Sequence, residues 1–330
     1  MDAHRWCSRR SPGLVTKPDM HAIDRRCAVL PRGARPGFGV ACGRLSDLAK
    51  IKIGTCAWSF DDWRGVFYPE HLPAAGWLAF YAQRFPAVEV DSTFYHAPTL
   101  HVTAHWRAVT PEDFVFSPKL PRDLTHERKL RDCAGPLAEF LAGLEPLRAK
   151  LGCVLVQLPP YFTLRHDEHA LRDFVRHLPR DFRFAIEFRD AAWHVPRVTH
   201  LLAEHGVCWA WTDTTDRDHA AEGAFEFFPR TADFIYVRLL GDLETKDRAD
   251  GGPVFHYRKR RWPREASMES WAEKIRATLP EVAHAFVHVS NHFEGYAPDS
   301  ARRLAEKLRV PLPTPPTEPA ARSDPQMDLL

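Results

Sequence analysis

Short apolar runs recur along this chain, and most of them end beside a polar residue. Eight such runs follow one another between residues 51 and 289. The stretches between them carry apolar residues at helical spacing instead, as Leu137, Phe140, Leu141 and Leu144 do. Regular alternation of strand and helix favours a parallel sheet with helices on its faces. The predicted strands are Ile51–Cys56, Val88–Val90, Phe114–Phe116, Val154–Val156, Phe184–Ile186, Val207–Trp211, Ile235–Val237 and Phe286–Val289.

A helix is expected after each strand. Eight strand–helix units can close into a barrel or lie as an open, doubly wound sheet. No G-x-G-x-x-G motif follows the first strand, which weakens the dinucleotide-binding open sheet. We therefore predict an α/β fold, a single-domain (β/α)8 TIM barrel over residues 49–310, close to the roughly 250 residues typical of that fold. The expected helices are 73–85, 102–109, 133–149, 167–178, 195–205, a weak one at 218–222, 267–279 and 297–308.

The two ends of the chain show no sustained periodicity. Residues 1–48 are rich in Arg, Pro and Gly, and we expect a poorly ordered extension there. Residues 311–330 begin PLPTPPTEPAARSDP, a composition typical of a disordered, Pro-rich tail. Both ends are therefore expected to lie outside the barrel core.

Composition narrows the class of protein. The formal net charge of +2 gives no global attraction to nucleic acid or to a membrane. No apolar run approaches the roughly 20 residues that span a bilayer. The seven cysteines are odd in number and none forms a C-x-x-C pair, which argues against a disulfide framework or a zinc knuckle. We expect a cytoplasmic protein without a metal or other cofactor.

Side-chain parity brings charged groups to the inside of the predicted barrel. Successive side chains of a strand point to opposite faces, so residues two apart share a face. If the large apolar residues pack outward against the helices, the charges point inward near the carboxyl ends of the strands, where barrels bind substrates. The expected inward sets are Glu89 with Asp91, Ser117 with Lys119, Ala185 with Glu187 and Arg189, Trp209 with Trp211 and Asp213, and Tyr236 with Arg238.

Two interpretations of these charges stay open. They could form a salt-bridge network that closes the core, or an active site in which Glu187 or Glu89 donates or accepts a proton. Paired carboxylates would suit a hydrolase such as a glycosidase. Our catalytic candidates are Glu187, Glu89, Asp213 and Lys119. Our substrate-binding candidates are Asp91, Tyr95, His126, Gln157, Arg189, Trp193, Arg238, Asn291 and His292.

The last two strands suggest an anion site. Loops there often bind phosphate in this fold through helix-end amides. Arg238, Asn291 and the segment Gly295–Ser300 could form such a clamp. Ordinary capping of the following helix is the alternative.

Two further patterns carry less weight. His284, His288 and His292 recur at every fourth position, but ligands strung along a strand do not converge on one metal. The run RKRRWPR at 258–264 is interpreted as a solvated loop, so we do not expect nucleic acid as a partner.

Aromatic residues near the first strand are expected to cap the barrel; they are Trp58, Phe60, Trp63, Phe67 and Tyr68.

Seven stretches resemble the domain of unknown function 72, the YecE-like family of predicted TIM barrels. Two departures stand out: Leu240 occupies a position where a polar residue is expected after Arg238, and Ser290 one where a second Asn would precede Asn291. The resemblance implies a barrel with a pocket at the carboxyl ends of its strands, and the family has no agreed activity. The stretches are IKIGTCAWSFDDWRGVFYP (51–69), VEVDSTFYHAP (88–98), FVFSPKLPRDLTH (114–126), VLVQLPPYF (154–162), FAIEFRDAAWH (184–194), YVRLLGD (236–242) and SNHFEGYAPDSARRL (290–304).

Taken together, these features favour an enzyme that applies acid–base chemistry to a small polar substrate, phosphorylated or sugar-like. The alternative is a non-catalytic barrel that binds an anion or nucleic acid. The fold alone does not decide between them, because this barrel hosts many unrelated chemistries.

Overall fold

The computed structural model describes residues 50–213, 228–241 and 256–315. The weak helix expected at 218–222, the extension at 1–48 and most of the tail at 311–330 lie outside the described residues. Of the tail, residues 311–315 are described, and Leu312 is partly buried against the core.

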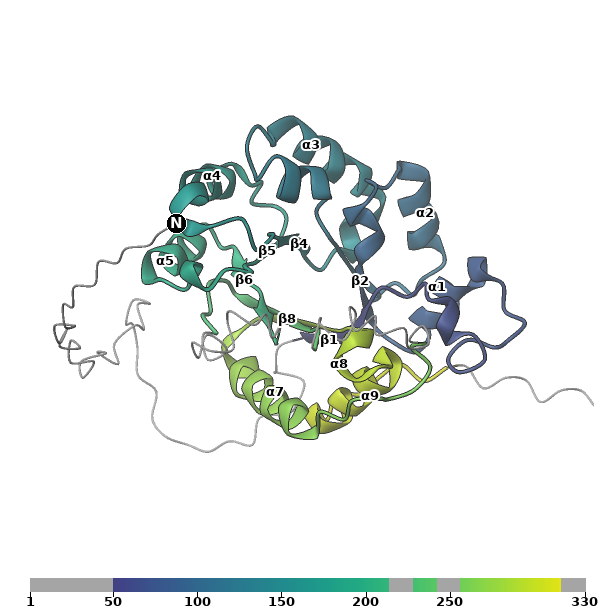
Figure 1. Ribbon diagram of the computed structural model, residues 1–330. Helices are drawn as coiled ribbons and strands as arrows, with labels where there is room; N and C mark the ends of the chain where they lie inside the picture. Colours follow the sequence, from purple (N-terminus) through teal and green to yellow (C-terminus); the bar gives the residue numbers. More distant parts are fainter. Residues whose placement is uncertain (1–49, 214–227, 242–255, 316–330) are drawn as a thin grey trace, which may run out of the picture. The chain divides into compact units, whose positions relative to one another are not determined.

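Parallel strands surround a central axis, as the alternating pattern predicts (Figure 1). Six of them form one sheet in the order β3-β2-β1-β9-β8-β7, and three form a second in the order β4-β5-β6. A parallel bridge between Lys119 and Leu155 joins β3 to β4, and Ala210 alone separates β6 from β7. The strands therefore follow one another in chain order around the barrel. They are β1 (Lys50–Cys56), β2 (Ala87–Val90), β3 (Val115–Pro118), β4 (Val154–Gln157), β5 (Phe184–Glu187), β6 (Cys208–Trp209), β7 (Trp211–Thr212), β8 (Phe234–Leu239) and β9 (His284–Val289).

Helices lie around the outside of the strands (Figure 1). The short helix α8 was not expected: Ser290 begins it by accepting a hydrogen bond from the His292 amide at 3.2 Å, and Gly295 ends it with φ 101°. A glycine suits that position because other residues rarely adopt positive φ. The helices are α1 (Trp77–Ala82), α2 (Leu100–Ala108), α3 (Ala134–Gly143), α4 (Leu164–His177), α5 (Pro196–Glu204), α7 (Glu265–Thr278), α8 (Asn291–Glu294) and α9 (Ala297–Leu308).

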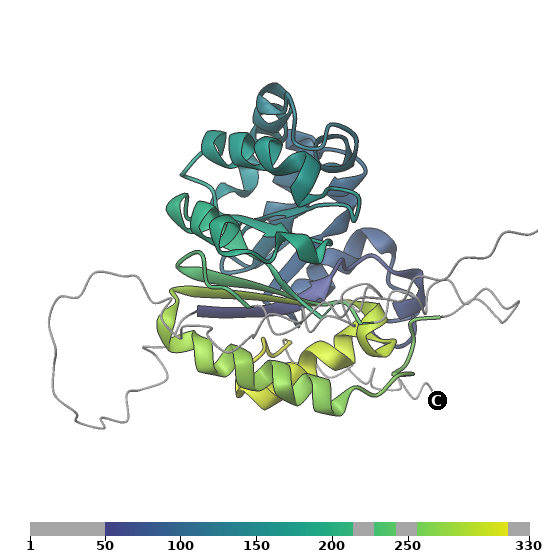
Figure 2. The same cartoon turned by 60° about the vertical axis from the view of Figure 1, so that its left-hand side comes forward.

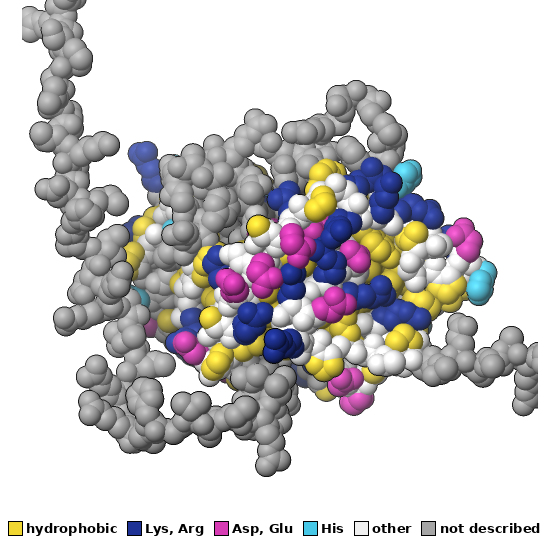
Figure 3. All heavy atoms as spheres, turned by 90° about the horizontal axis from the view of Figure 1, so that it is seen from below, with side chains coloured by type: hydrophobic (Ala, Val, Ile, Leu, Met, Phe, Trp, Pro, Cys, Tyr) yellow, Lys and Arg dark blue, Asp and Glu magenta, His cyan; other side chains and the backbone are white. Residues whose placement is uncertain are grey.

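Ion pairs tie α7 to α9 on one flank of the barrel, where the two helices lie side by side (Figure 2). Lys307 of α9 lies 2.6 Å from Glu265 and 2.8 Å from Glu269, both on α7. The space-filling view of this side shows Lys and Arg side chains interspersed with Asp and Glu (Figure 3). Such a mixed surface offers no extended field of one sign.

The parity argument holds for most strands. The hydroxyl of Tyr236 on β8 donates to Glu89 on β2 at 2.7 Å, so these two side chains meet across the inside of the barrel. Val88 and Ile186 belong instead to the larger cluster that packs between strands and helices. The inward sets built on Glu89, Ala185 and Tyr236 are therefore confirmed.

The sixth predicted strand is the exception, and its expected inward set was wrong. Trp209 pairs in register with Ile186, and both belong to the outer cluster. Cys208 and Ala210 point inward instead, among the interior residues. Both parities of this run are apolar, so side-chain size decides: small residues fit the crowded interior, and the indoles pack against helices.

No helix among the described residues is both long enough and apolar enough to cross a membrane. Four cysteines of the described ranges, Cys56, Cys133, Cys153 and Cys208, are buried free thiols.

Candidate active site

A buried arginine lies at the centre of a group of charged residues inside the barrel. We call this group the charged layer; its members are Glu89, Asp91, Lys119, Glu187, Arg189 and Arg238. Arg238 comes from β8 and is 3% exposed. Its Nε and Nη2 donate to Glu89 at 2.8 and 2.6 Å, and its Nη1 donates to Glu187 at 2.5 Å. Two carboxylates from β2 and β5 therefore engage all three guanidinium nitrogens. Buried charges need such pairing, because an unpaired one carries a large desolvation penalty.

Glu187 is held as a carboxylate. Its other oxygen accepts a hydrogen bond from Nε of Arg189. Burial alone would raise the pKa of Glu187, but the charges of Arg189 and Arg238 outweigh it and lower the pKa to about 2. A group ionised through the physiological range between two arginines is a poor proton donor. For Glu89, Arg238 and Glu187 the salt-bridge interpretation therefore fits the geometry best.

A second ion pair in the layer is looser. The ammonium of Lys119 lies 3.7 Å from Oδ1 of Asp91, and 4.4 Å from the ring centre of Phe94. Within the described parts of the chain, Oδ1 of Asp91 has no hydrogen-bond partner although the atom is buried. The Lys119 side chain is 10% exposed and that of Asp91 is 36% exposed, so this pair reaches solvent where the glutamates do not.

Burial acts on the two members of this pair in opposite directions. It lowers the pKa of Lys119 and raises that of Asp91, and in each case the partner's charge opposes the shift. Both shifts are toward the neutral forms, so burial brings the pKa values of the two groups closer together.

Local sequence fixes these two residues at neighbouring strand ends. Glu89 lies opposite Ser117 in the β2–β3 ladder. Asp91 and Lys119 are each two residues further along, so they lie side by side just beyond the ends of β2 and β3. Thr93 ties the ends together, because its hydroxyl donates to the Lys119 carbonyl at 2.7 Å and accepts from the Lys119 amide at 3.0 Å.

Other predicted binding residues follow the same strand ends. Gln157 ends β4 in register with Glu187 and is partly exposed. His126 lies in a short π-helix after β3 (Asp123–Glu127), 5.0 Å from the Phe94 ring, and burial with nearby cations lowers its pKa to about 4. Tyr95 follows Phe94 and is 68% exposed.

The predicted anion clamp is not assembled. Arg238 is engaged by two glutamates, and Asn291 caps the start of α9, since its Oδ1 accepts from the Ala297 amide at 3.0 Å and from Nε1 of Trp63 at 3.2 Å. Helix capping is therefore the role that the geometry gives Asn291. His292 contacts the Tyr257 hydroxyl at 3.2 Å, apart from these groups.

Two more candidates lie away from the charged layer. Asp213 accepts hydrogen bonds from the Leu240 and Gly241 amides at 2.5 and 3.1 Å, and burial raises its pKa to about 6. Asp213 is two residues after Trp211 and therefore shares its outward-facing side of the strand. Its hydrogen bonds hold the loop that follows β8. Trp193 is fully buried and donates to the Phe162 carbonyl at 2.8 Å, so it supports the strand ends from the core.

The sequence analysis did not select two residues that the structure shows in polar or charged contacts. Phe94, beneath the Lys119 ammonium, and Glu294, which is fully buried and accepts from Ser300 at 2.8 Å, were not candidates. Neither lies on a strand, so parity gave no signal for them. Among the described residues no group of three His, Cys, Asp or Glu side chains could hold a metal ion.

The fold and the charged layer define a class of protein: a parallel α/β barrel with buried ion pairs at the carboxyl ends of its strands. A family model described as "Protein of unknown function DUF72" matches residues 52–323, and the chain belongs to this family. The resemblance seen in the sequence is thereby confirmed.

Relatives and solved structures agree with this assignment. UPF0759 protein YunF of Bacillus subtilis strain 168 is 26% identical over 280 residues, 79% of this chain and 95% of that protein. UPF0759 protein YecE of Escherichia coli K12 is 34% identical over 139 residues, 42% of this chain and about half (48%) of that protein. A DUF72 family protein from Thermotoga maritima MSB8 has a TM-score of 0.66 at 26% identity, covering 79% of this chain and 99% of that one.

Proposed function

We propose that the protein is an enzyme in which Lys119 and Asp91 form the proton-transfer pair. The observation that carries this proposal is the contrast within the charged layer. Glu89 and Glu187 are hydrogen-bonded to arginines, whereas Lys119 and Asp91 lie 3.7 Å apart and reach solvent. Groups that react with a ligand need an accessible atom with hydrogen-bonding capacity to spare.

The chemistry follows from the two protonation states. With the proton on Asp91, the neutral Lys119 amine accepts a proton from the substrate and becomes an ammonium. The Asp91 carboxylic acid then gives its proton to the atom on which negative charge develops. Each group is regenerated when the proton passes from the Lys119 ammonium to the Asp91 carboxylate, and both pKa shifts are in the direction that this cycle needs.

The surroundings favour a small polar substrate. Arg189 uses Nε for Glu187, and its side chain is 10% exposed, so its terminal nitrogens can bind a phosphate or another oxygen-rich group. Gln157 adds an amide that both donates and accepts hydrogen bonds. A phosphorylated or sugar-like compound matches these groups.

The paired-glutamate hydrolase is the weaker option. A glycosidase of that type needs one carboxyl group that holds a proton near neutral pH. Two arginines keep the pKa of Glu187 at about 2, and Glu89 accepts hydrogen bonds from Arg238 and Tyr236.

The test is a conversion screen with matched variants. Purified protein is incubated with a panel of sugars and sugar phosphates, and turnover is followed by NMR. We expect Lys119→Met and Asp91→Asn to lower any turnover by about 100-fold or more, the scale of lost general acid–base catalysis. Lys274→Met is the control, because that ammonium also lies over an aromatic ring, 4.9 Å from Phe228 on the α7 flank.

The outcomes separate the interpretations. Full turnover in Lys119→Met would contradict the proposal. A wild-type protein that binds panel compounds and converts none would favour the non-catalytic, anion-binding barrel instead.

A further inference from the structure

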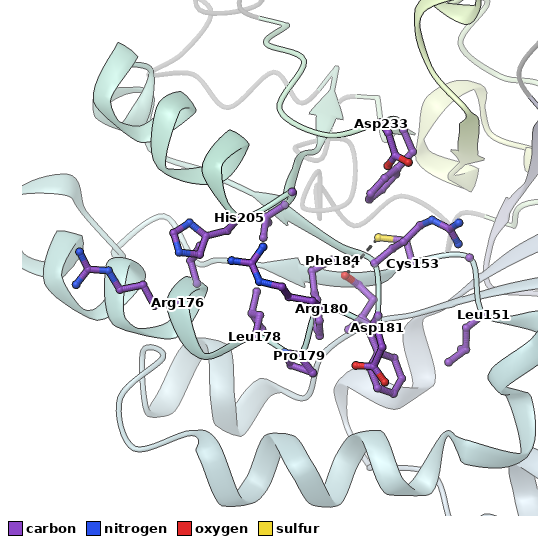
Figure 4. Close-up of a pocket in the computed structure, with 18 of the residues that line it drawn as sticks. Leu151, Cys153, Arg176, Leu178, Pro179, Arg180, Asp181, Phe184, His205 and Asp233 are labelled. Carbon is purple, nitrogen blue, oxygen red and sulfur yellow. Dashed lines mark hydrogen bonds between the residues drawn. The ribbon is translucent and has the colours of Figure 1, made fainter. Parts of the chain in front are cut away.

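A cavity of about 520 Å³ lies at the amino ends of several strands (Figure 4), whereas Lys119 follows the carboxyl end of β3. Its walls come from the segments that lead into the strands: Val154 begins β4, Phe184 begins β5, Val207 precedes β6 and Phe234 begins β8. A volume of this size is typical of small-molecule sites. The cavity is therefore separate from the charged layer at the carboxyl ends.

The cavity is rich in arginine. Arg148, Arg176, Arg180 and Arg183 line it, against two carboxylates from Asp181 and Asp233. Asp181 is already paired, since its Oδ2 accepts from Nη2 of Arg148 at 2.5 Å. Figure 4 shows Arg180 and His205 on one side of the cavity and Asp233 on the other.

Among the described residues, no acidic side chain pairs with Arg176, Arg180 or Arg183. The guanidinium of Arg183 contacts an imidazole, with Nη2 3.1 Å from Nε2 of His284. The cavity thus carries an excess of positive charge that its own acids do not balance.

The apolar residues of the lining offer the cavity little surface. Phe184 and Phe234 are 2% and 1% exposed, and Leu178 is 8% exposed. A ligand in the cavity would therefore meet mainly the arginines. Arginine is the residue that binds phosphate and carboxylate groups through two parallel hydrogen bonds.

We propose that this cavity binds a small anion whose phosphate or carboxylate group lies at Arg180 and Arg183. Inorganic phosphate is the probe. The site is independent of the proton-transfer pair.

The experiment measures binding of inorganic phosphate by calorimetry. In the double variant Arg180→Ala, Arg183→Ala the Kd for phosphate should rise about tenfold or more, because charge-assisted hydrogen bonds are lost. Both side chains are exposed, so the variant should fold, and circular dichroism checks this.

Two controls locate the site. Arg107→Ala removes an exposed arginine from the last turn of α2, outside the cavity, and Lys119→Met alters the candidate active site. Both should bind inorganic phosphate like the wild type. Wild-type affinity in the folded double variant, loss of affinity in Lys119→Met, or no binding of phosphate to the wild type would each overturn the proposal.

Discussion

Glu187 lies between Arg189 and Arg238 in the barrel interior, and its charge neutralises theirs. We expect Glu187→Gln to lower the free energy of unfolding by about 3–5 kcal/mol, because it leaves buried positive charge without a partner. Urea denaturation measures the change. Glu168→Gln is the matched control: Glu168 also contacts two arginines, but it is on the surface, where such pairs contribute about 1 kcal/mol or less. A Glu187→Gln protein as stable as the control variant would contradict this role.

His288 gives the stability a pH dependence of known sign. It is fully buried, with Nε2 3.2 Å from the Ser117 hydroxyl, and burial lowers its pKa from 6.5 to about 3. Between these values the unfolded chain binds a proton that the folded protein does not. The folded state therefore loses stability as the pH falls below about 6.5.

Replacing this histidine should remove that contribution. In His288→Gln, the slope of unfolding free energy against pH between pH 4 and 6 should fall by about 1.4 kcal/mol per pH unit, the equivalent of one proton. His169→Gln, at a side chain 88% exposed, should leave the slope near that of the wild type. Equal slopes in both variants would mean that His288 is protonated in the folded protein.

At the residue scale, the sequence predicted which side chains enter the barrel but not their pairing. Parity placed Glu187, Arg189 and Arg238 inward, and the structure agrees. It could not show that Arg238 reaches Glu89 and Glu187 together, because that contact joins strands that are not neighbours. The prediction of Glu187 as the main acid or base was made without this contact with Arg238.

Among the elements, the junction after β8 depends on one glycine. Gly241 has φ 68°, and a Cβ built there would lie 2.3 Å from the backbone oxygen of His292 at the start of α8. Gly206, after α5, has φ 64° but nothing within 4 Å of its Cβ position. The two sites therefore share a positive φ and differ in the contacts that a Cβ would make.

Alanine at each position separates these two effects. We expect Gly206→Ala to cost about 1–2 kcal/mol from positive φ alone. Gly241→Ala should cost more, because backbone must move to accommodate the methyl group, and it should also disturb the Asp213 hydrogen bonds to this loop. Chemical denaturation of both variants measures the difference, and equal losses would show that the junction adapts freely.

The elements were predicted best where polarity alternates. Glu89 between Val88 and Val90 leaves one choice of face, whereas Cys208–Trp211 is apolar throughout and was placed the wrong way round. The short helix α8 escaped prediction because four residues show no periodicity. Size, capping and local turns decide such segments, and polarity patterns do not carry that information.

On the scale of the whole molecule, the eight-unit alternation was sufficient to predict the α/β barrel, and contacts with its core continue to residue 312. Val310 and Leu312 are partly buried against the core, beyond the last residue of α9. A chain ending at 310 should melt about 2–4 °C below one ending at 315, the shift that about 1 kcal/mol gives in a domain of this size. Scanning calorimetry compares the two, and identical melting temperatures would show that residues 311–315 add no stability.

The central claim is that Lys119, with Asp91 beside it, can lose its proton more readily than an ordinary lysine. Selective carbon-13 labelling of lysine side chains and NMR titration of the Lys119 signal, assigned with Lys119→Met, measure its pKa directly. We expect a pKa below the ordinary 10.5, and a lower one still in Asp91→Asn, because the carboxylate opposes the effect of burial. A pKa of about 10.5 that does not change in Asp91→Asn would contradict the account.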